Sequence, residues 1–174
     1  MEHSKKLQGL RLEPAKSKAE LWKRRFYRFF LEFWETIEAV ELVPNWHIEY
    51  LCDQLQDVYE IWARGEAQDD VLINVPPGSS KSTIVTQLFP AWLWVKRGSI
   101  RCMSASYAAD LATSHAAKTR DCLKSDKFNL LFPGLIEFKD DTDGKTHFKN
   151  TSMGERFVTS TTSSATGVHG DFVI

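Results

Sequence analysis

The stretch Val71-Leu-Ile-Asn-Val-Pro-Pro-Gly-Ser-Ser-Lys-Ser-Thr-Ile-Val-Thr-Gln-Leu88 decides the predicted fold. Its pattern is typical of a buried strand, a tight loop and a helix that begins at Lys81-Ser82-Thr83. This order aims backbone N–H groups and the positive end of a helix dipole at one point, where a polyphosphate can bind. In such a phosphate-binding loop, Lys81 reaches the β and γ phosphates and the Ser82 hydroxyl holds Mg²⁺.

The loop departs from the usual pattern G-x-x-x-x-G-K-[ST], because Val75 and Ser80 stand where that pattern has glycine. Gly78 lies inside the loop, and Pro76-Pro77 fix the backbone angle φ and remove two N–H donors. An ordinary surface turn between a strand and a helix is the alternative interpretation. The flanking strand and helix patterns favour the phosphate loop.

Length and composition indicate one globular protein. The chain has 174 residues, 43% of them hydrophobic, with six Trp and eleven Phe, so it can bury a core of its own. The formal net charge of -1 gives no overall basic field for nucleic acid, although Lys and Arg outnumber Glu between Met1 and Arg28. We interpret that local excess as a solvated basic arm, with contact to phosphate as the alternative.

Cysteine usage and hydropathy favour a cytosolic protein. Cys52, Cys102 and Cys122 are widely spaced and follow no metal-ligand pattern, so we expect small buried side chains in a reducing compartment. No apolar run approaches the ~20 residues of a membrane span, and the N-terminus lacks the apolar core of a signal peptide. We expect no membrane partner.

Two helices are predicted before the loop. The first begins at a capping box that starts at Ser17, and its aromatic residues recur at helical spacing to about Val40. We interpret this aromatic stripe as a face that packs on the core, with a partner-binding face as the alternative. A proline then interrupts the pattern, and a second helix, capped by Asn45, runs to about Arg64.

After the loop, the pattern alternates between helix and strand. Pro90 should kink or break the loop helix near Phe89. A strand is then predicted over residues 100–106 and a helix over 108–124, on which His115 is interpreted as a packing histidine. Strands that alternate with helices imply a parallel sheet with right-handed crossovers.

The last third of the chain reads as an apolar loop over residues 128–138, an exposed hairpin turn over 140–144 and short strands after it. Phe172-Val-Ile174 begins a further apolar strand. Nucleotide hydrolysis needs a carboxylate at the end of such a strand. We therefore expect the catalytic residues after Ile174, because Asp171 lies at the wrong end of the strand, and we predict little or no hydrolysis by this chain.

Together these elements predict an α/β fold of the P-loop NTPase type (RecA-like), with a mostly parallel sheet flanked by helices and preceded by two aromatic-rich helices. The sheet is expected to be incomplete because the chain stops early. We expect a flexible basic arm over residues 1–16, a helical segment over 17–69 and the P-loop ATPase core over 70–174.

Short motifs follow one another along the chain. They are Pro44-Asn-Trp-His47, Pro76-Pro-Gly-Ser-Ser-Lys-Ser82, Phe89-Pro-Ala-Trp92, Ser104-Ala-Ser-Tyr107 with Asp110-Leu111, Phe132-Pro133 and Thr166-Gly-Val-His-Gly-Asp171. Each block is short, but the ordered series is specific. Over about residues 34–174 it resembles the large subunit of tailed-bacteriophage terminases.

The resemblance implies an ATP-driven motor that packages double-stranded viral DNA into a procapsid. The implied partners are ATP, Mg²⁺, viral DNA, the portal protein and the small terminase subunit, in an oligomeric ring assembled on the portal in the host cytoplasm. The residues it implies for nucleotide binding are Asn45, Trp46 and His47 near the adenine, and Pro77, Gly78, Ser79, Ser80, Lys81, Ser82 and Thr83 in the loop, with Ser82 as the metal ligand.

The sequence departs from that family in two respects. Many relatives carry a basic residue early in the loop, where Gly78 offers no charge, so a residue that senses the γ-phosphate is not assigned. The family's second carboxylate motif and its nuclease domain are absent, so the chain resembles the N-terminal part of a longer protein.

Three functional classes stay open. One is the terminase ATPase portion, and another is a different P-loop enzyme, such as a helicase or a small-molecule kinase. A kinase would need a lid with arginines, and no arginine cluster follows Arg120. The last is a non-catalytic remnant or interaction module built on the two N-terminal helices. Trp46-His47 has its own alternative, in which Trp46 only staples the second helix to the first.

Overall fold

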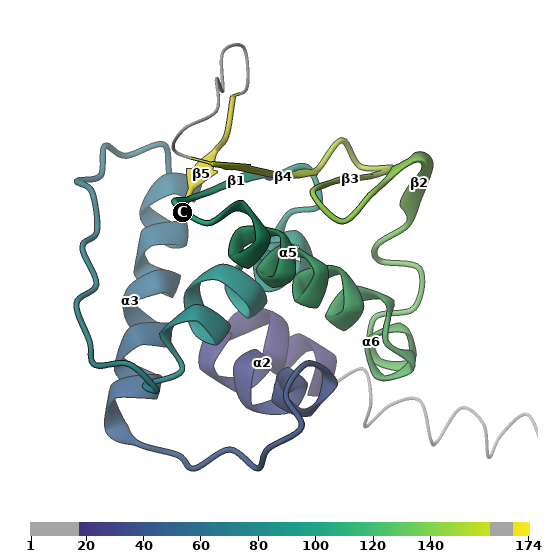
Figure 1. Cartoon of the computed structure of the whole chain (residues 1–174). Helices are drawn as coiled ribbons and strands as arrows, with labels where there is room; N and C mark the ends of the chain where they lie inside the picture. Colours follow the sequence, from purple (N-terminus) through teal and green to yellow (C-terminus); the bar gives the residue numbers. More distant parts are fainter. Residues whose placement is uncertain (1–17, 161–168) are drawn as a thin grey trace, which may run out of the picture.

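Five strands form one mixed sheet in the computed structural model, which describes residues 18–160 and 169–174 (Figure 1). Their order is β2-β3-β4-β1-β5. β1 pairs in parallel with β4 and β5, whereas β3 pairs antiparallel with β2 and β4. The strands are β1 (Arg101–Ser106), β2 (Phe138–Asp143), β3 (His147–Asn150), β4 (Glu155–Ser160) and β5 (Phe172–Val173).

The α/β class is confirmed, but the prediction of a mostly parallel sheet is wrong. Residues 144–146 join β2 to β3, and residues 151–154 join β3 to β4. Connections this short only reverse the chain, so both pairs are antiparallel. The chain between β1 and β4 contains α5 (Ala109–Lys124), α6 (Asp126–Leu131), β2 and β3, which leaves room for a parallel crossover.

The helices lie along one face of the sheet in Figure 1. Besides α5 and α6 they are α2 (Phe26–Phe33), the 3-10 turn η1 (Trp34–Thr36), α3 (Trp46–Ala63), the π-helical turn η2 (Thr83–Leu88) and α4 (Phe89–Lys96). α3 and α5 confirm the predicted second helix and the predicted helix over 108–124. α6 was not predicted. The Ser125 hydroxyl caps it by accepting the Phe128 N–H at 3.1 Å.

The predicted first helix is not continuous. Residues 18–24 are helical, Arg25 is extended, and the chain becomes helical again in α2. Partners on α3 hold this break, because the Arg25 guanidinium contacts Glu49 at 2.6 Å and the Gln56 side chain accepts the Phe26 N–H at 2.9 Å. The expected arm over 1–16 and the Ser17 cap lie outside the described residues.

The predicted break at Pro90 is also absent. Residues 81–96, which we call the loop helix, are helical throughout, and η2 winds more widely just before Phe89. Proline has no N–H to continue the ordinary helical ladder. A π-helical turn beside it absorbs the irregularity without ending the helix.

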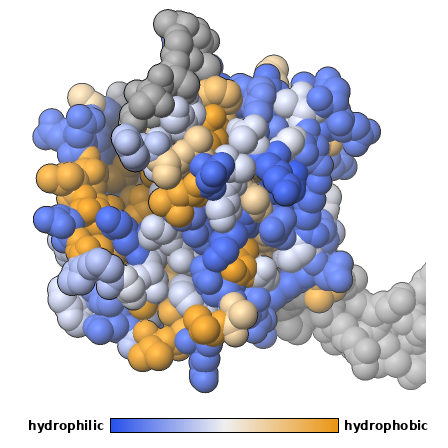
Figure 2. All heavy atoms as spheres, viewed as in Figure 1, coloured by the Kyte–Doolittle hydropathy of each residue, from blue (hydrophilic) through white to orange (hydrophobic). Residues whose placement is uncertain are grey.

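The predicted buried strand over residues 71–75 is wrong. The segment has no strand partner in the described chain, and the side chain of Leu72 is 94% exposed. Figure 2 shows hydrophobic surface on the side of the molecule where this segment runs beside α3. The edge strand β5 is separated from this segment by a cavity that both line, so the segment does not extend the sheet. The predicted hairpin turn is shifted as well, since residues 140–143 belong to β2 and the turn follows them.

One core joins the N-terminal helices to the sheet. Four phenylalanines of α2 are fully buried, and the Phe26 ring lies 5.3 Å from the rings of both Phe89 and Trp92 on the loop helix. This confirms that the aromatic stripe is a core-packing face. The three cysteines are buried and free, as expected. In the described part of the chain, no helix is both long and apolar enough to cross a membrane.

Candidate functional site

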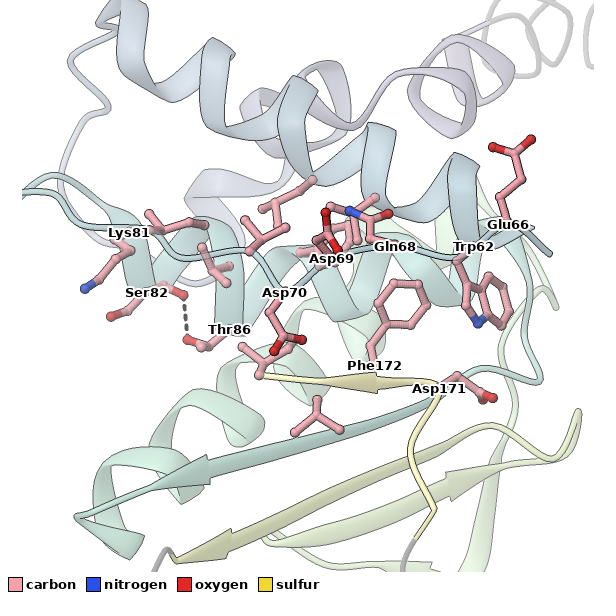
Figure 3. A pocket seen from close by; sticks show the side chains of 18 residues that line it. Trp62, Glu66, Gln68, Asp69, Asp70, Lys81, Ser82, Thr86, Asp171 and Phe172 are labelled. Atoms are coloured by element: carbon pink, nitrogen blue, oxygen red, sulfur yellow. Dashed lines mark hydrogen bonds between the residues drawn. The ribbon is translucent and has the colours of Figure 1, made fainter. Parts of the chain in front are cut away.

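A cavity of about 600 Å³ lies between α3, the loop helix and β5 (Figure 3). Its walls are mostly apolar side chains from these elements and from the segment before the loop. Figure 3 shows Lys81 and Ser82 at one end and Trp62 and Asp171 at the other. A volume of this size falls within the roughly 300–1,000 Å³ of small-molecule sites.

The loop over residues 76–82 turns through two left-handed residues. Gly78 has φ 80° and Ser80 has φ 59°. Glycine adopts such angles without strain, whereas a residue with a Cβ pays roughly 1–2 kcal/mol. The usual motif has glycine at the position of Ser80, and the structure gives the reason. The Ser79 hydroxyl closes the turn by donating to the Pro76 carbonyl at 2.7 Å.

Lys81 and Ser82 form the first turn of the loop helix. The Lys81 side chain is exposed and extends outward at the mouth of the cavity (Figure 3). Ser82 is helical and its carbonyl accepts the Thr86 hydroxyl at 2.7 Å. Both residues line the cavity, and so does Thr86. An ammonium group and a hydroxyl group therefore stand beside each other where a phosphate chain can enter.

His115 supports this turn from α5. Its Nδ1 lies 3.1 Å from the Thr86 hydroxyl oxygen. Burial lowers the pKa of His115, and the positive charges of Lys118 and Arg156 lower it further. The neutral ring then donates its Nδ1 proton to Thr86, whose own proton goes to the Ser82 carbonyl. His115 is therefore a satisfied packing residue, as the sequence indicated.

Thr83 faces the protein rather than the cavity. It is buried, and its hydroxyl donates to the Glu38 carboxylate at 3.2 Å. The Glu38 carboxylate also accepts a hydrogen bond of 2.7 Å from the Lys118 ammonium group. Thr83 thus anchors the loop helix to the segment after η1, and the structure does not present its side chain to a ligand at the cavity.

Within the segment Asn45-Trp46-His47, His47 is the residue with a hydrogen bond to the loop. His47 Nε2 lies 3.2 Å from the Ser79 carbonyl oxygen, which accepts the proton of that nitrogen. Trp46 is 77% exposed, and its ring lies 6.2 Å from that of His47 and 6.3 Å from that of Tyr50, both on α3. It therefore does not staple α3 to the first helix. Asn45 occupies the N-cap position, but its side chain makes no capping bond, and none of the segment lines the cavity.

Oxygen donors that suit Mg²⁺ share the cavity with Ser82. The carboxylates of Asp69 and Asp70 line it, whereas Glu66 and Asp171 lie at its far end and are bonded to Arg64 and Arg101. Magnesium is typically held by one or two carboxylates together with substrate phosphates and water. Across the described residues, no group of three or more His, Cys, Asp or Glu side chains could hold a metal by itself. The site therefore fits a Mg²⁺ ion that arrives with a polyphosphate better than a resident metal.

Asp171 holds β5 against β1. Its carboxylate accepts the Arg101 N–H at 2.8 Å and lies 3.2 Å from the guanidinium. Burial alone would raise the pKa of Asp171, but the hydrogen bonds from Arg101 outweigh it and lower that pKa. The engaged carboxylate is structural, in agreement with its expected place at the start of the strand.

Sequence reasoning missed the residues that support the loop helix from a distance. Glu38 and Lys118 lie 80 positions apart in the chain, and no local pattern marks either of them. Arg156 was missed for the same reason, although an arginine inside a strand with buried alternate positions is an unusual signal. No family model, curated protein or solved structure matches this chain, so the site rests on its own residues and geometry.

Proposed function

We propose that this chain binds ATP·Mg²⁺ at the loop over residues 76–83 and is the ATP-binding N-terminal part of a phage terminase large subunit. One observation carries the nucleotide assignment. Lys81 and Ser82 open the loop helix at the mouth of a cavity of about 600 Å³ that is large enough for a nucleotide. The carboxylates of Asp69 and Asp70, which line the same cavity, would supply oxygen donors for the metal.

The loop geometry supports binding of phosphate rather than of a ligand without negative charge. The first N–H groups of a helix lack intrahelical partners, so the start of the loop helix offers donors and a positive dipole end. Lys81 adds a full charge, and Ser82 adds a hydroxyl that can coordinate magnesium. Pro76 and Pro77 offer no N–H, so the donors come from the second half of the loop.

The packaging role rests on the ordered motifs that resemble terminases. Under this proposal, ATP hydrolysis in the assembled motor drives double-stranded viral DNA through the portal, with the small terminase subunit as a further partner. His47 is the best placed residue to link adenine recognition to the loop, because it contacts the Ser79 carbonyl. Trp46 offers an exposed ring on which a purine can stack.

Titration with ATP·Mg²⁺ by isothermal calorimetry tests the nucleotide proposal. Lys81→Ala should weaken binding by ~1.5–3 kcal/mol, about 10- to 150-fold, because it removes a charge-assisted contact to phosphate. Lys139→Ala is the matched control, since Lys139 is an exposed lysine on β2 at the other end of the sheet. Equal ATP affinities in wild type and Lys81→Ala would remove the loop from the proposed site.

A further inference from the structure

Pro90 leaves a carbonyl without its usual donor in the middle of the loop helix. In an α-helix the N–H of residue 90 would bond to the carbonyl four residues earlier, which is that of Thr86. The turn before Pro90 is π-helical, and the Phe89 N–H bonds to the Ile84 carbonyl, five residues earlier. Pro90 therefore has no N–H to offer to the carbonyl of Val85 in that wider register or of Thr86 in the ordinary one. A partly buried carbonyl without a partner destabilises the fold, so a donor from outside the helix is favourable here.

Arg156 of β4 supplies that donor. Its Nη2 donates to the Thr86 carbonyl at 3.1 Å. The side chain is 1% exposed, and among the described residues its Nε and Nη1 have no hydrogen-bond partner. Burial of this cation without a carboxylate is costly, and the same burial lowers the pKa of Arg156. A well-packed apolar residue at this position would avoid that free-energy cost, so we take the bond to the Thr86 carbonyl as the specific contribution of the arginine.

The same residue, Thr86, is bonded to the loop. Its hydroxyl donates to the Ser82 carbonyl at 2.7 Å, and both residues line the cavity. Thr119 of α5 secures the next carbonyl, that of Gln87, at 2.8 Å. Contacts from β4 and α5 therefore hold the carbonyls of Thr86 and Gln87 in η2, and the Thr119 hydroxyl also lies 3.5 Å from the Thr86 carbonyl. The contact from Arg156 leads through Thr86 to Ser82.

We propose that Arg156 is a positioning residue for the nucleotide site, because its bond to the Thr86 carbonyl holds the helical turn that carries Ser82 beside a proline that has no N–H to offer. The proposal rests on the proposed function for its ligand. It makes no claim that Arg156 touches the nucleotide, since the guanidinium does not line the cavity.

A double-mutant cycle between positions 156 and 90 tests this. Arg156→Met keeps much of the side-chain volume and removes the donor. Pro90→Ala restores an N–H, which bonds to the Thr86 carbonyl when the turn winds as an ordinary α-helix. We expect Arg156→Met alone to weaken ATP·Mg²⁺ binding at least about tenfold and to speed amide hydrogen exchange over residues 86–92 by a similar factor. In the Pro90→Ala background both effects of Arg156→Met should largely disappear.

Arg120→Met is the matched control. Arg120 is also a largely buried arginine that donates to a carbonyl, that of Asp143, but it does not contact the loop helix through that bond. It should leave ATP affinity and exchange over residues 86–92 unchanged. A general response to losing a buried arginine would appear in this variant too, and that result would overturn the proposal.

The outcomes separate the two claims. If the wild-type chain binds ATP·Mg²⁺ but the effects of substitutions at positions 156 and 90 are independent, the role of Arg156 is overturned and the nucleotide site stands. Absence of wild-type ATP binding overturns the proposed function, and the exchange measurement then still decides whether Arg156 holds the turn. If Arg156→Met alone does not fold, the Pro90→Ala/Arg156→Met double variant is still expected to fold, and an unfolded double variant contradicts the proposal.

Discussion

Residues 71–75 and β1 are two runs of similar length that the sequence predicts as strands, and only one of them is a strand. β1 lies inside the sheet, with β4 on one side and β5 on the other. The run Val71-Leu-Ile-Asn-Val75 is unpaired, and Leu72 on it is almost fully exposed. Yet the unpaired run is the richer in Val and Ile, the residues that favour strands.

The difference shows that pairing partners, rather than local propensity, decide between these two segments. β1 gains parallel hydrogen bonds along its whole length with β4. Residues 71–75 face β5 only across the cavity, which Val71, Ile73 and Val173 all line. A segment that cannot reach a sheet edge forms its backbone hydrogen bonds with water. A side-chain preference for strands of about 1 kcal/mol does not replace the missing partner strand.

The largest expected effect contrasts a buried residue immediately before β1 with an exposed one in the unpaired run. Ile100→Ala should lower the free energy of unfolding by ~2–5 kcal/mol, because Ile100 is 1% exposed and its loss leaves a cavity. Leu72→Ala is the matched control and should change it by less than ~0.5 kcal/mol. Urea unfolding measures both values, and a large loss in Leu72→Ala would show that residues 71–75 pair in solution.

A smaller effect is expected where β5 is fastened to β1. Asp171→Asn should lower stability at pH 7 by about 0.5–1 kcal/mol, a modest value because the Arg101 guanidinium is partly exposed. The pKa of Asp171 is lowered in the folded state. The ionised carboxylate therefore stabilises the fold fully above the ordinary pKa of 3.8, and this stabilisation is lost as the pH falls through the lowered pKa.

Urea unfolding of wild type and Asp171→Asn at pH 7 and below pH 4 checks the sign. The difference in stability between them should shrink as the pH falls. A difference that grows in acid would mean that burial, and not Arg101, controls this carboxyl group.

The smallest effect concerns the loop. Ser80→Gly should raise stability by about 0.5 kcal/mol, because relief of roughly 1–2 kcal/mol of left-handed strain is partly offset by the greater freedom of glycine in the unfolded chain. Ser80→Ala keeps the Cβ and should give no gain. Thermal unfolding of the two variants distinguishes them, and an equal gain in both would place the strain elsewhere.

Elements with strong local signals were predictable from the sequence. The helical spacing of apolar residues gave α3 and α5, and the aromatic stripe gave the core-packing face of α2. The break at Arg25 was not predictable, because Glu49 and Gln56 on another helix hold it. α6 was missed although Ser125 before Asp126 is a helix-start signal.

The candidate site divides in the same way. Lys81 and Ser82 follow from a local motif, and the structure places both at the cavity. Thr83 belongs to the same motif but is turned inward to Glu38. The supports of the loop, Glu38 and Arg156, act across the fold, so only the structure brings them to the loop helix.

The most direct measurement of the central claim is amide hydrogen exchange of the wild-type chain with and without ATP·Mg²⁺. We expect slower exchange over residues 76–83, where the phosphates would bind, and over residues 68–73, which border the cavity. β2 and β3, at the far edge of the sheet, should exchange at the same rate in both conditions. Protection confined to β2 and β3, or none anywhere at saturating ATP, would contradict a nucleotide site at this loop.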